Sequence, residues 1–264
     1  MHLAFAIFGD REETRRVNLE GSRNVFEAAV LAGVKRLVYA SSVAAYGFHP
    51  ENPLPLGEEV PARGSDGFYY SAQKAELEAT LARIVAGSDV DAYVFRPCVV
   101  AGPRATMLVR KAVEGARLGD PLPALRRGLA RLPLPAPVLP DPGVPIQLVH
   151  HDDVARALAA AIAGDGPPGA YNLAGDGEIS VADLAHALGW HAVPLPRLAA
   201  GLGARVAGRL AFASSQLEWA TAVRTPVPMD TAKAGRELGW EPRHDAAQTL
   251  AETALAARDA GLLD

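Results

Sequence analysis

The chain has 264 residues, of which 49% are hydrophobic, and a formal net charge of -4 at pH 7. This length allows a sizeable core in one large domain, or in a large domain and a small one. Acidic and basic residues are interspersed, which argues against nucleic acid or a membrane surface as the partner. The single cysteine, Cys98, excludes an internal disulfide framework and is typical of a reducing compartment.

The chain opens with MHLAFAIFGD, in which an apolar run starts at residue 3 and ends at Asp10. We predict a buried strand in this run. It is too short to cross a membrane, and it lacks the basic flank and cleavage site of a secretory signal. We therefore expect a cytoplasmic protein.

A helix is predicted to follow Asp10, because Glu13 stands three residues later as in a capping pair. Its apolar face is predicted from residues that recur at helical spacing: Val17, Gly21, Val25, Ala28 and Ala32. Gly33 then ends the helix, and KRLVYASS predicts a short buried strand at Arg36–Ser41.

Further strands and helices alternate along the chain. A second helix is predicted from about Phe68 to Ile84, and DAYVFRP predicts a strand that ends at Pro97. IQLVHHDDVARALAAAI predicts a strand followed by a helix, and AYNLAG predicts another short strand. This alternation is typical of an α/β fold with a parallel sheet and helices on its faces.

The pair Tyr70 and Lys74 in YYSAQK is the sharpest candidate for chemistry. Residues four apart share one helix face, and a nearby ammonium favours the phenolate form of a tyrosine that shuttles protons. Ser41 and Ser42 end the strand before this helix, and the carboxyl end of a strand is where an open α/β sheet binds ligands. The alternative is an incidental pair on a solvated helix and a turn rich in serine.

At this point the sequence resembles the extended short-chain dehydrogenase/reductases, also called the NAD-dependent epimerase/dehydratase family. The resemblance runs over nearly the whole chain. It is carried by motifs in order: HLA at His2–Ala4, VNLEGSRNVFEAA at Val17–Ala29, YASSVAAYG, YSAQK, FRPCVVAGP at Phe95–Pro103, VHHDDVARAL, AYNLAGDGEIS and MDTAKAGRELGWEP.

The resemblance implies four catalytic residues. Ser42 resembles the hydroxyl that hydrogen-bonds the reacting carbonyl or alcohol, and Tyr70 resembles the acid/base. Lys74 would lower the pKa of Tyr70 and bind the nicotinamide ribose. Asn18 stands where the family keeps an asparagine near the active site. Hydride would then move between a substrate carbon and the nicotinamide of NAD or NADP.

The resemblance also implies a cofactor site, to which Asn18, Ser41, Tyr70 and Lys74 contribute. Pro97 and Val99 would flank the nicotinamide, while Ala4 and Phe5 would lie beside the dinucleotide. The implied fold is a doubly wound, Rossmann-like sheet. The dinucleotide-binding part is expected over residues 1–120 and 146–176, and a smaller substrate-binding region over residues 121–145 and 177–264.

Two departures from the family pattern shape the expected function. Dehydratases place Asp and Glu just after the catalytic hydroxyl, where this chain has Val43 and Ala44, so a sugar 4,6-dehydratase is not expected. The glycine-rich turn that holds the pyrophosphate is absent from the 264 residues. Relative to the family, two βα units and a strand are missing, roughly 60 to 70 residues.

This absence leaves two functions open. In the first, the chain is an N-terminally truncated form of an NAD(P)-dependent oxidoreductase or epimerase. In the second, it is a non-catalytic relative that acts through protein contacts. We expect the 264-residue chain to bind NAD(P)H weakly or not at all. The sheet edge left unpaired by the missing strands also makes a homodimer an open expectation.

The remaining candidates concern substrate and metal. A small-molecule substrate is expected, with a nucleotide sugar as the family's commonest choice. Arg126, Arg127 and Arg131, in a proline-rich stretch, could contact a diphosphate, or could simply form an exposed cationic segment. The run HHDD at 150–153 predicts no metal site, because neighbours on a strand point to opposite faces. Asp152 or Asp153 is expected to cap the following helix instead.

Overall fold

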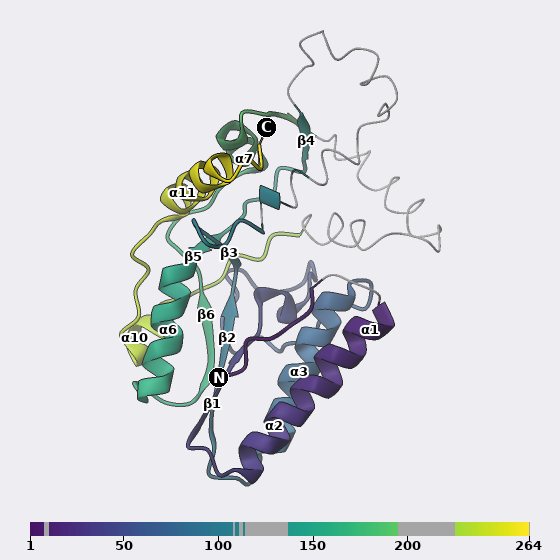
Figure 1. Ribbon diagram of the computed structural model, residues 1–264, viewed down its shortest axis with the longest axis vertical. Helices are drawn as coiled ribbons and strands as arrows, with labels where there is room; N and C mark the ends of the chain where they lie inside the picture. The colour runs from purple at the N-terminus through teal and green to yellow at the C-terminus, as the bar shows by residue number, and fades with distance from the viewer. Residues whose placement is uncertain (8–10, 108, 111–112, 114–136, 195–224, 264) are drawn as a thin grey trace.

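The computed structural model describes residues 1–7, 11–107, 109–110, 113, 137–194 and 225–263 (Figure 1). Its central sheet has three parallel strands in the order β1-β2-β6. They are β1 (Arg36–Ala40), β2 (Asp91–Pro97) and β6 (Gly169–Leu173). Ala40 lies opposite Phe95, which in turn lies opposite Tyr171. The expected α/β fold with a parallel sheet is therefore confirmed.

Helices cover both faces of this sheet (Figure 1). On one face lie α2 (Gly21–Leu31) and α3 (Tyr69–Val85), and on the other lie α6 (His151–Ala163) and α10 (Ala232–Leu238). The alternation of side chains along β1 explains the two layers. Leu37 and Tyr39 pack with residues of α2 and α3, whereas Val38 packs with residues of α6 and α10.

The N-terminal helical region has three parts, namely α1 (Arg11–Arg15), a π-helical segment (Arg16–Glu20) and α2. The predicted apolar face is wrong, since Val17 is 51% exposed and Val25 is 40% exposed. The buried face lies one residue further along and is mostly polar: Thr14, Asn18, Ser22 and Phe26. These polar groups can be buried because hydrogen bonds satisfy them, such as the one of 2.9 Å between Ser22 Oγ and His2 Nε2.

The buried strand predicted at the N-terminus is also wrong. Among residues 1–7, only His2 pairs with β1: its amide donates to Val38 O at 2.8 Å, and its carbonyl accepts from Ala40 N at 3.2 Å. Leu3 is 48% exposed. The segment leaves the sheet because the backbone of Ala6 is bound instead by a side chain of the neighbouring helical region.

A second group of elements packs beyond the carboxyl ends of these strands (Figure 1). It contains two parallel strand pairs and two helices. These are β3 (Val99–Ala101) with β5 (Leu148–His150), β4 (Val138–Asp141) with β7 (His191–Pro194), α7 (Val181–Leu188) and α11 (Ala246–Asp259). Leu148, Leu184 and Leu250 share its buried core. The strand predicted in IQLVHH is β5, and the strand predicted in AYNLAG is β6.

The expected division into two regions stays a prediction. Within the segment 177–264, α10 and Trp240 pack into the core beside β6 and α6. The described ranges include no helix with the length and apolar character needed to cross a membrane.

Candidate functional site

Helix α3 places Tyr70 and Lys74 one turn apart on its buried face. Tyr70 is 9% exposed and Lys74 is 3% exposed. The helix is fixed at its N-terminal end by Ser71, whose hydroxyl donates to Ala44 O and accepts from Ser65 N. The shared face that the sequence predicts for Tyr70 and Lys74 is therefore present, and it points into the protein rather than to solvent.

Ser42 meets Tyr70 at the carboxyl end of β1. It begins the 3₁₀ turn Val43–Tyr46, and its Oγ accepts from Ala44 N at 3.2 Å. Burial raises the pKa of Tyr70, and a hydrogen bond between its side chain and Ser42 opposes this rise. Both sequence interpretations of Ser42 therefore apply: it caps a turn, and it contacts Tyr70.

Lys74 binds the backbone beside this pair. Its Nζ donates to Ala40 O at 2.8 Å. Burial lowers the pKa of Lys74 to about 7, although the Glu78 carboxylate opposes this shift. The lowered pKa of Tyr70 implied by the family resemblance is not found in this structure, where burial prevails.

Phe5 covers both side chains. Its ring meets the Tyr70 ring edge-on, with centroids 5.4 Å apart, and the Nζ of Lys74 lies 4.0 Å from its centroid. The N-terminal segment is held in place further along by a hydrogen bond from the Tyr69 hydroxyl to Ile7 O. Ala4, expected beside the dinucleotide, is exposed.

Asn18 positions this N-terminal segment against α3. It is 1% exposed, and its amide forms two hydrogen bonds with the backbone of Ala6, at 2.8 and 2.9 Å. Its Nδ2 also donates to Gln73 Oε1 at 2.9 Å. Asn18 is thus linked to α3 through Gln73, the residue that precedes Lys74, and it acts here as a positioning residue.

Ser41 belongs to a buried ionic cluster that the sequence did not suggest. Its Oγ donates to Glu78 Oε1 at 2.5 Å, and Arg96 donates to the same carboxylate at 2.6 Å. The side chains of Arg96 and Glu78 are only 8% and 9% exposed. Two signals could have revealed the cluster: an arginine inside a buried strand, and a glutamate one turn beyond Lys74 on the same helix face.

Pro97 and Val99 lie at the same edge of the sheet as the serines. Pro97 ends β2 and Val99 begins β3. Because Ser41 N donates to Phe95 O at 2.8 Å, the carboxyl ends of β1 and β2 adjoin. The contact of Pro97 and Val99 with a nicotinamide stays a prediction, as do the cofactor roles of the other residues.

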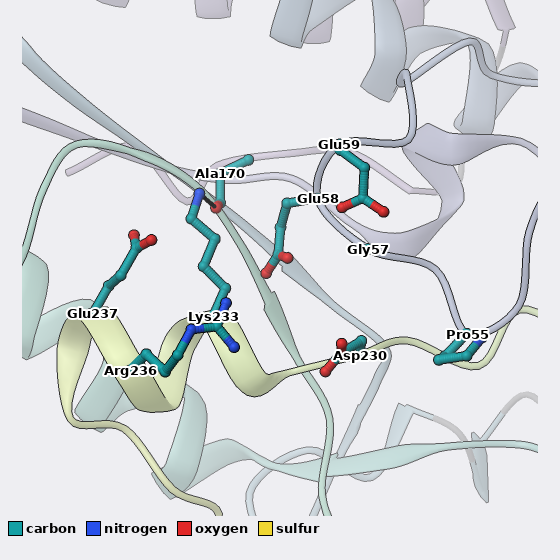
Figure 2. A pocket seen from close by; sticks show the side chains of 9 residues that line it. All are labelled: Pro55, Gly57, Glu58, Glu59, Ala170, Asp230, Lys233, Arg236 and Glu237. Atoms are coloured by element: carbon teal, nitrogen blue, oxygen red, sulfur yellow. Dashed lines mark hydrogen bonds between the residues drawn. The ribbon is translucent and has the colours of Figure 1, made fainter.

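A polar cavity of about 470 Å³ lies elsewhere, between α10, β6 and the segment 55–59 (Figure 2). Three of its charged side chains form hydrogen bonds with β6. Lys233 donates to Ala170 O at 2.8 Å, Glu237 accepts from the Tyr171 hydroxyl, and Glu58 accepts from Asn172 N. These contacts connect α10 to β6, so the cavity is not assigned to the site around Tyr70.

The HHDD run folds differently from the prediction. His150 itself caps α6, since its Nδ1 accepts from Asp152 N at 3.2 Å, so the expected cap by Asp152 or Asp153 is wrong. The rings of His150 and His151 also do not diverge, and their centroids lie 4.3 Å apart. The helix begins at His151, so strand alternation does not apply there. Arg126, Arg127 and Arg131 lie outside the described residues.

Comparison with known families adds a second line of information. A model of the NAD dependent epimerase/dehydratase family matches residues 6–174. These residues include Asn18, Ser42, Tyr70 and Lys74, together with β1, β2 and β6.

Two curated relatives differ in how much they share. A 3-diazoavenalumate denitrifying reductase of Streptomyces sp is 31% identical over 235 residues, which is 88% of this chain and 69% of that protein. A 3beta-hydroxysteroid-dehydrogenase/decarboxylase of Arabidopsis thaliana is 34% identical over 103 residues. That match covers 39% of this chain and 24% of the plant enzyme, so the chain spans about a quarter of its length.

Among solved structures, the Bordetella bronchiseptica enzyme WbmG in complex with NAD has a TM-score of 0.68 and 20% identity. The match covers 99% of this chain and 71% of WbmG. A second WbmG structure, with NAD and UDP, also has a TM-score of 0.68, at 19% identity, and covers 98% of this chain and 73% of that one. At these identities the likeness establishes the fold.

Proposed function

Because the chain belongs to the NAD-dependent epimerase/dehydratase family, we propose that it transfers hydride between a nicotinamide dinucleotide and a secondary alcohol or ketone. The observation that carries this proposal is the hydrogen bond between Ser42 and Tyr70 at the carboxyl end of β1, with Lys74 one helix turn away. This edge of a parallel sheet is where ligands bind in open α/β folds.

In the proposed reaction, the hydroxyl of Tyr70 exchanges a proton with the substrate oxygen, and the hydroxyl of Ser42 holds that oxygen by a hydrogen bond. A bound NAD or NADP would supply or accept the hydride. The residues fit such a group, because Lys74 in its ammonium form has three donor hydrogens and uses one for the bond to Ala40 O. The remaining two are available to hydroxyl groups of a ribose once Phe5 moves aside.

We propose a nucleotide sugar as the substrate class. The crystal structure of WbmG with NAD and UDP supports this, since that enzyme has the same fold and binds a uridine nucleotide. Val43 and Ala44 follow Ser42 and carry no acid or base, which favours a reductase, dehydrogenase or epimerase over a dehydratase that eliminates water. The choice between NAD and NADP is left to measurement.

A titration of NADH and NADPH fluorescence tests the proposal independently of the substrate. We expect weak but saturable binding to the wild type, and binding weaker by roughly tenfold or more in Lys74→Met, because a charge-assisted hydrogen bond is lost. Lys35→Met is the matched control, since Lys35 is exposed at the other end of β1. Equal binding by the two variants would contradict the assignment of Lys74.

A second function is favoured by one observation. The Phe5 ring covers Lys74 and Tyr70, which is the arrangement expected if no dinucleotide binds there. Such a protein would act through contacts with other proteins. The two functions differ in whether NADH binds once the Phe5 ring is removed: binding supports hydride transfer, and its absence supports the non-catalytic function.

A further inference from the structure

Three imidazole rings lie together where β5, α6 and α11 meet. The ring centroids of His150 and His244 lie 3.9 Å apart, and those of His150 and His151 lie 4.3 Å apart. The side chain of Glu252, on α11, reaches the same place, with its Oε2 3.3 Å from His150 Nε2. This cluster lies apart from the residues of the proposed hydride-transfer site and takes no part in that chemistry.

The three rings differ in how many of their nitrogen atoms form hydrogen bonds. Both nitrogen atoms of His151 are engaged, Nδ1 with Asp152 at 2.9 Å and Nε2 with Arg104 N at 3.2 Å. The other two rings each use Nδ1 alone, His150 with Asp152 N and His244 with Asp153 Oδ2. In the described part of the chain, neither Nε2 has a hydrogen-bond partner.

The Nε2 of His150 is the unusual atom of this cluster. His150 is 2% exposed, and this nitrogen is buried without a hydrogen-bond partner among the described residues. Glu252 is close to it, but the alignment does not make a hydrogen bond. A buried polar atom of this kind normally has a partner, so this nitrogen is a position at which a ligand could bind.

We propose that His150, His244 and Glu252 bind a divalent transition metal ion of the Zn²⁺ class. Each offers one ligand atom, and these atoms lie within 4.8 Å of one another. In a tetrahedral zinc site, ligand atoms are about 3.4 Å apart. The 3.3 Å between His150 Nε2 and Glu252 Oε2 matches this value. The rings of His150 and His244 are stacked, with 27° between their planes, so His244 would have to turn before both Nε2 lone pairs point at one ion. The side chains of His244 and Glu252 are partly exposed, which allows this movement. Water completes the coordination.

The surroundings of the ligands suit this ion. The His244 Nδ1 lies 3.2 Å from the buried carboxylate of Asp153, which is the carboxylate–histidine arrangement that orients metal-binding imidazoles. Because His150 Nδ1 accepts from Asp152 N, the neutral ring carries its proton on Nε2. To bind an ion at Nε2, the ring would have to change tautomer, with the proton moving to Nδ1 and the capping bond given up. The Nδ1–H group could then donate to Asp152 Oδ2, now 3.9 Å away, once that side chain turns toward it.

The site would have a structural consequence. His150 ends β5, His244 precedes α11 and Glu252 lies in the middle of α11, so one ion would tie the helix to the strand. The sequence prediction of no metal site considered HHDD and the residues near it in the sequence. The further ligands proposed here, His244 and Glu252, are about ninety and one hundred residues further along the chain.

Titration of EDTA-treated protein with ZnCl₂, in competition with a chromophoric chelator, tests the proposal. The expected result is one Zn²⁺ per chain, with affinity lower by roughly tenfold or more in His244→Ala and in Glu252→Gln. The matched control is His186→Ala, an exposed histidine on α7 outside the cluster. Its affinity should equal that of the wild type.

A thermal melt provides the second measurement. Zn²⁺ should raise the melting temperature of the wild type and of His186→Ala, but not that of His244→Ala or Glu252→Gln, because the ion binds only the folded state. Melts in EDTA show whether each variant folds. If His244→Ala does not fold, Glu252→Gln still tests the proposal, because the Glu252 side chain is 44% exposed and its replacement should not prevent folding. No saturable binding by the wild type, or equal weakening in His186→Ala, would overturn the proposal.

Discussion

The amino group of Lys74 lies 4.0 Å from the centroid of the Phe5 ring. A cation over an aromatic face is attracted to it, by about 0.5 to 2 kcal/mol depending on desolvation. Phe5 therefore competes with any ligand that would use the free hydrogens of Lys74. The position of the N-terminal segment should therefore affect how tightly the proposed cofactor site binds its ligand.

Replacement of Phe5 by alanine should strengthen NADH binding. The ring no longer covers Lys74 and Tyr70, and the lost cation–π contact corresponds to a gain of roughly 2- to 30-fold in affinity. Fluorescence titration measures this. Leu3→Ala, a change at a 48% exposed residue of the same segment, is the control and should bind like the wild type. An unchanged affinity in Phe5→Ala would mean that the ring does not occupy the cofactor site.

The buried amino group of Lys74 should make stability depend on pH. Its pKa falls from 10.5 to about 7 in the folded state, so the unfolded chain binds more protons between these values. The free energy of unfolding of the wild type, relative to Lys74→Met, should therefore rise by roughly 3 kcal/mol from pH 7 to pH 10. Urea unfolding at both pH values measures the difference. A difference that falls or stays constant with pH would contradict the lowered pKa.

Replacing only one partner of the Arg96–Glu78 ion pair should lower the free energy of unfolding strongly. Arg96→Met leaves the Glu78 carboxylate buried without its charged partner, and we expect a loss of about 3 to 5 kcal/mol in the free energy of unfolding. The double variant Arg96→Met, Glu78→Leu should lose less than the sum of the two single variants.

The control for this pair is Arg104→Ala, which breaks an exposed ion pair with Asp152. The Arg104 side chain is 77% exposed, so the expected loss is about 1 kcal/mol or less. If Arg96→Met lowered the free energy of unfolding as little as Arg104→Ala, the buried pair of Arg96 and Glu78 would not be important for stability.

The sequence predicted the sheet and its helices because their signals are local. Residues of β1 alternate between two apolar faces, and the spacing of Tyr70 and Lys74 places them on one side of a helix whatever surrounds it. Those predictions needed no knowledge of the neighbouring elements.

The predictions that were wrong concern features that depend on contacts between distant segments. The buried face of the N-terminal helical region is polar, and it is recognisable only once Asn18 meets Ala6 and Ser22 meets His2. The helical spacing of apolar residues instead predicted that the face with Val17 is buried, whereas Val17 is exposed. The cap of α6 by His150 and the cluster with Glu252 likewise depend on contacts between distant segments, which single-sequence patterns do not contain.

The most direct test of hydride transfer at Tyr70 is turnover of UDP- and dTDP-sugars with NAD⁺ or NADPH, by the wild type, Tyr70→Phe and Tyr93→Phe. The measurement follows nicotinamide absorbance and the sugar products together, because an epimerase leaves no net change in the cofactor. Tyr93 donates to Gly166 O in the core, so its variant controls for the loss of a buried hydroxyl.

We predict that Tyr70→Phe loses roughly 10²- to 10⁴-fold in turnover while it binds the cofactor like the wild type, and that Tyr93→Phe keeps its activity. Turnover in Tyr70→Phe equal to that of the wild type would contradict the assignment of Tyr70 as the acid/base, and so the central claim.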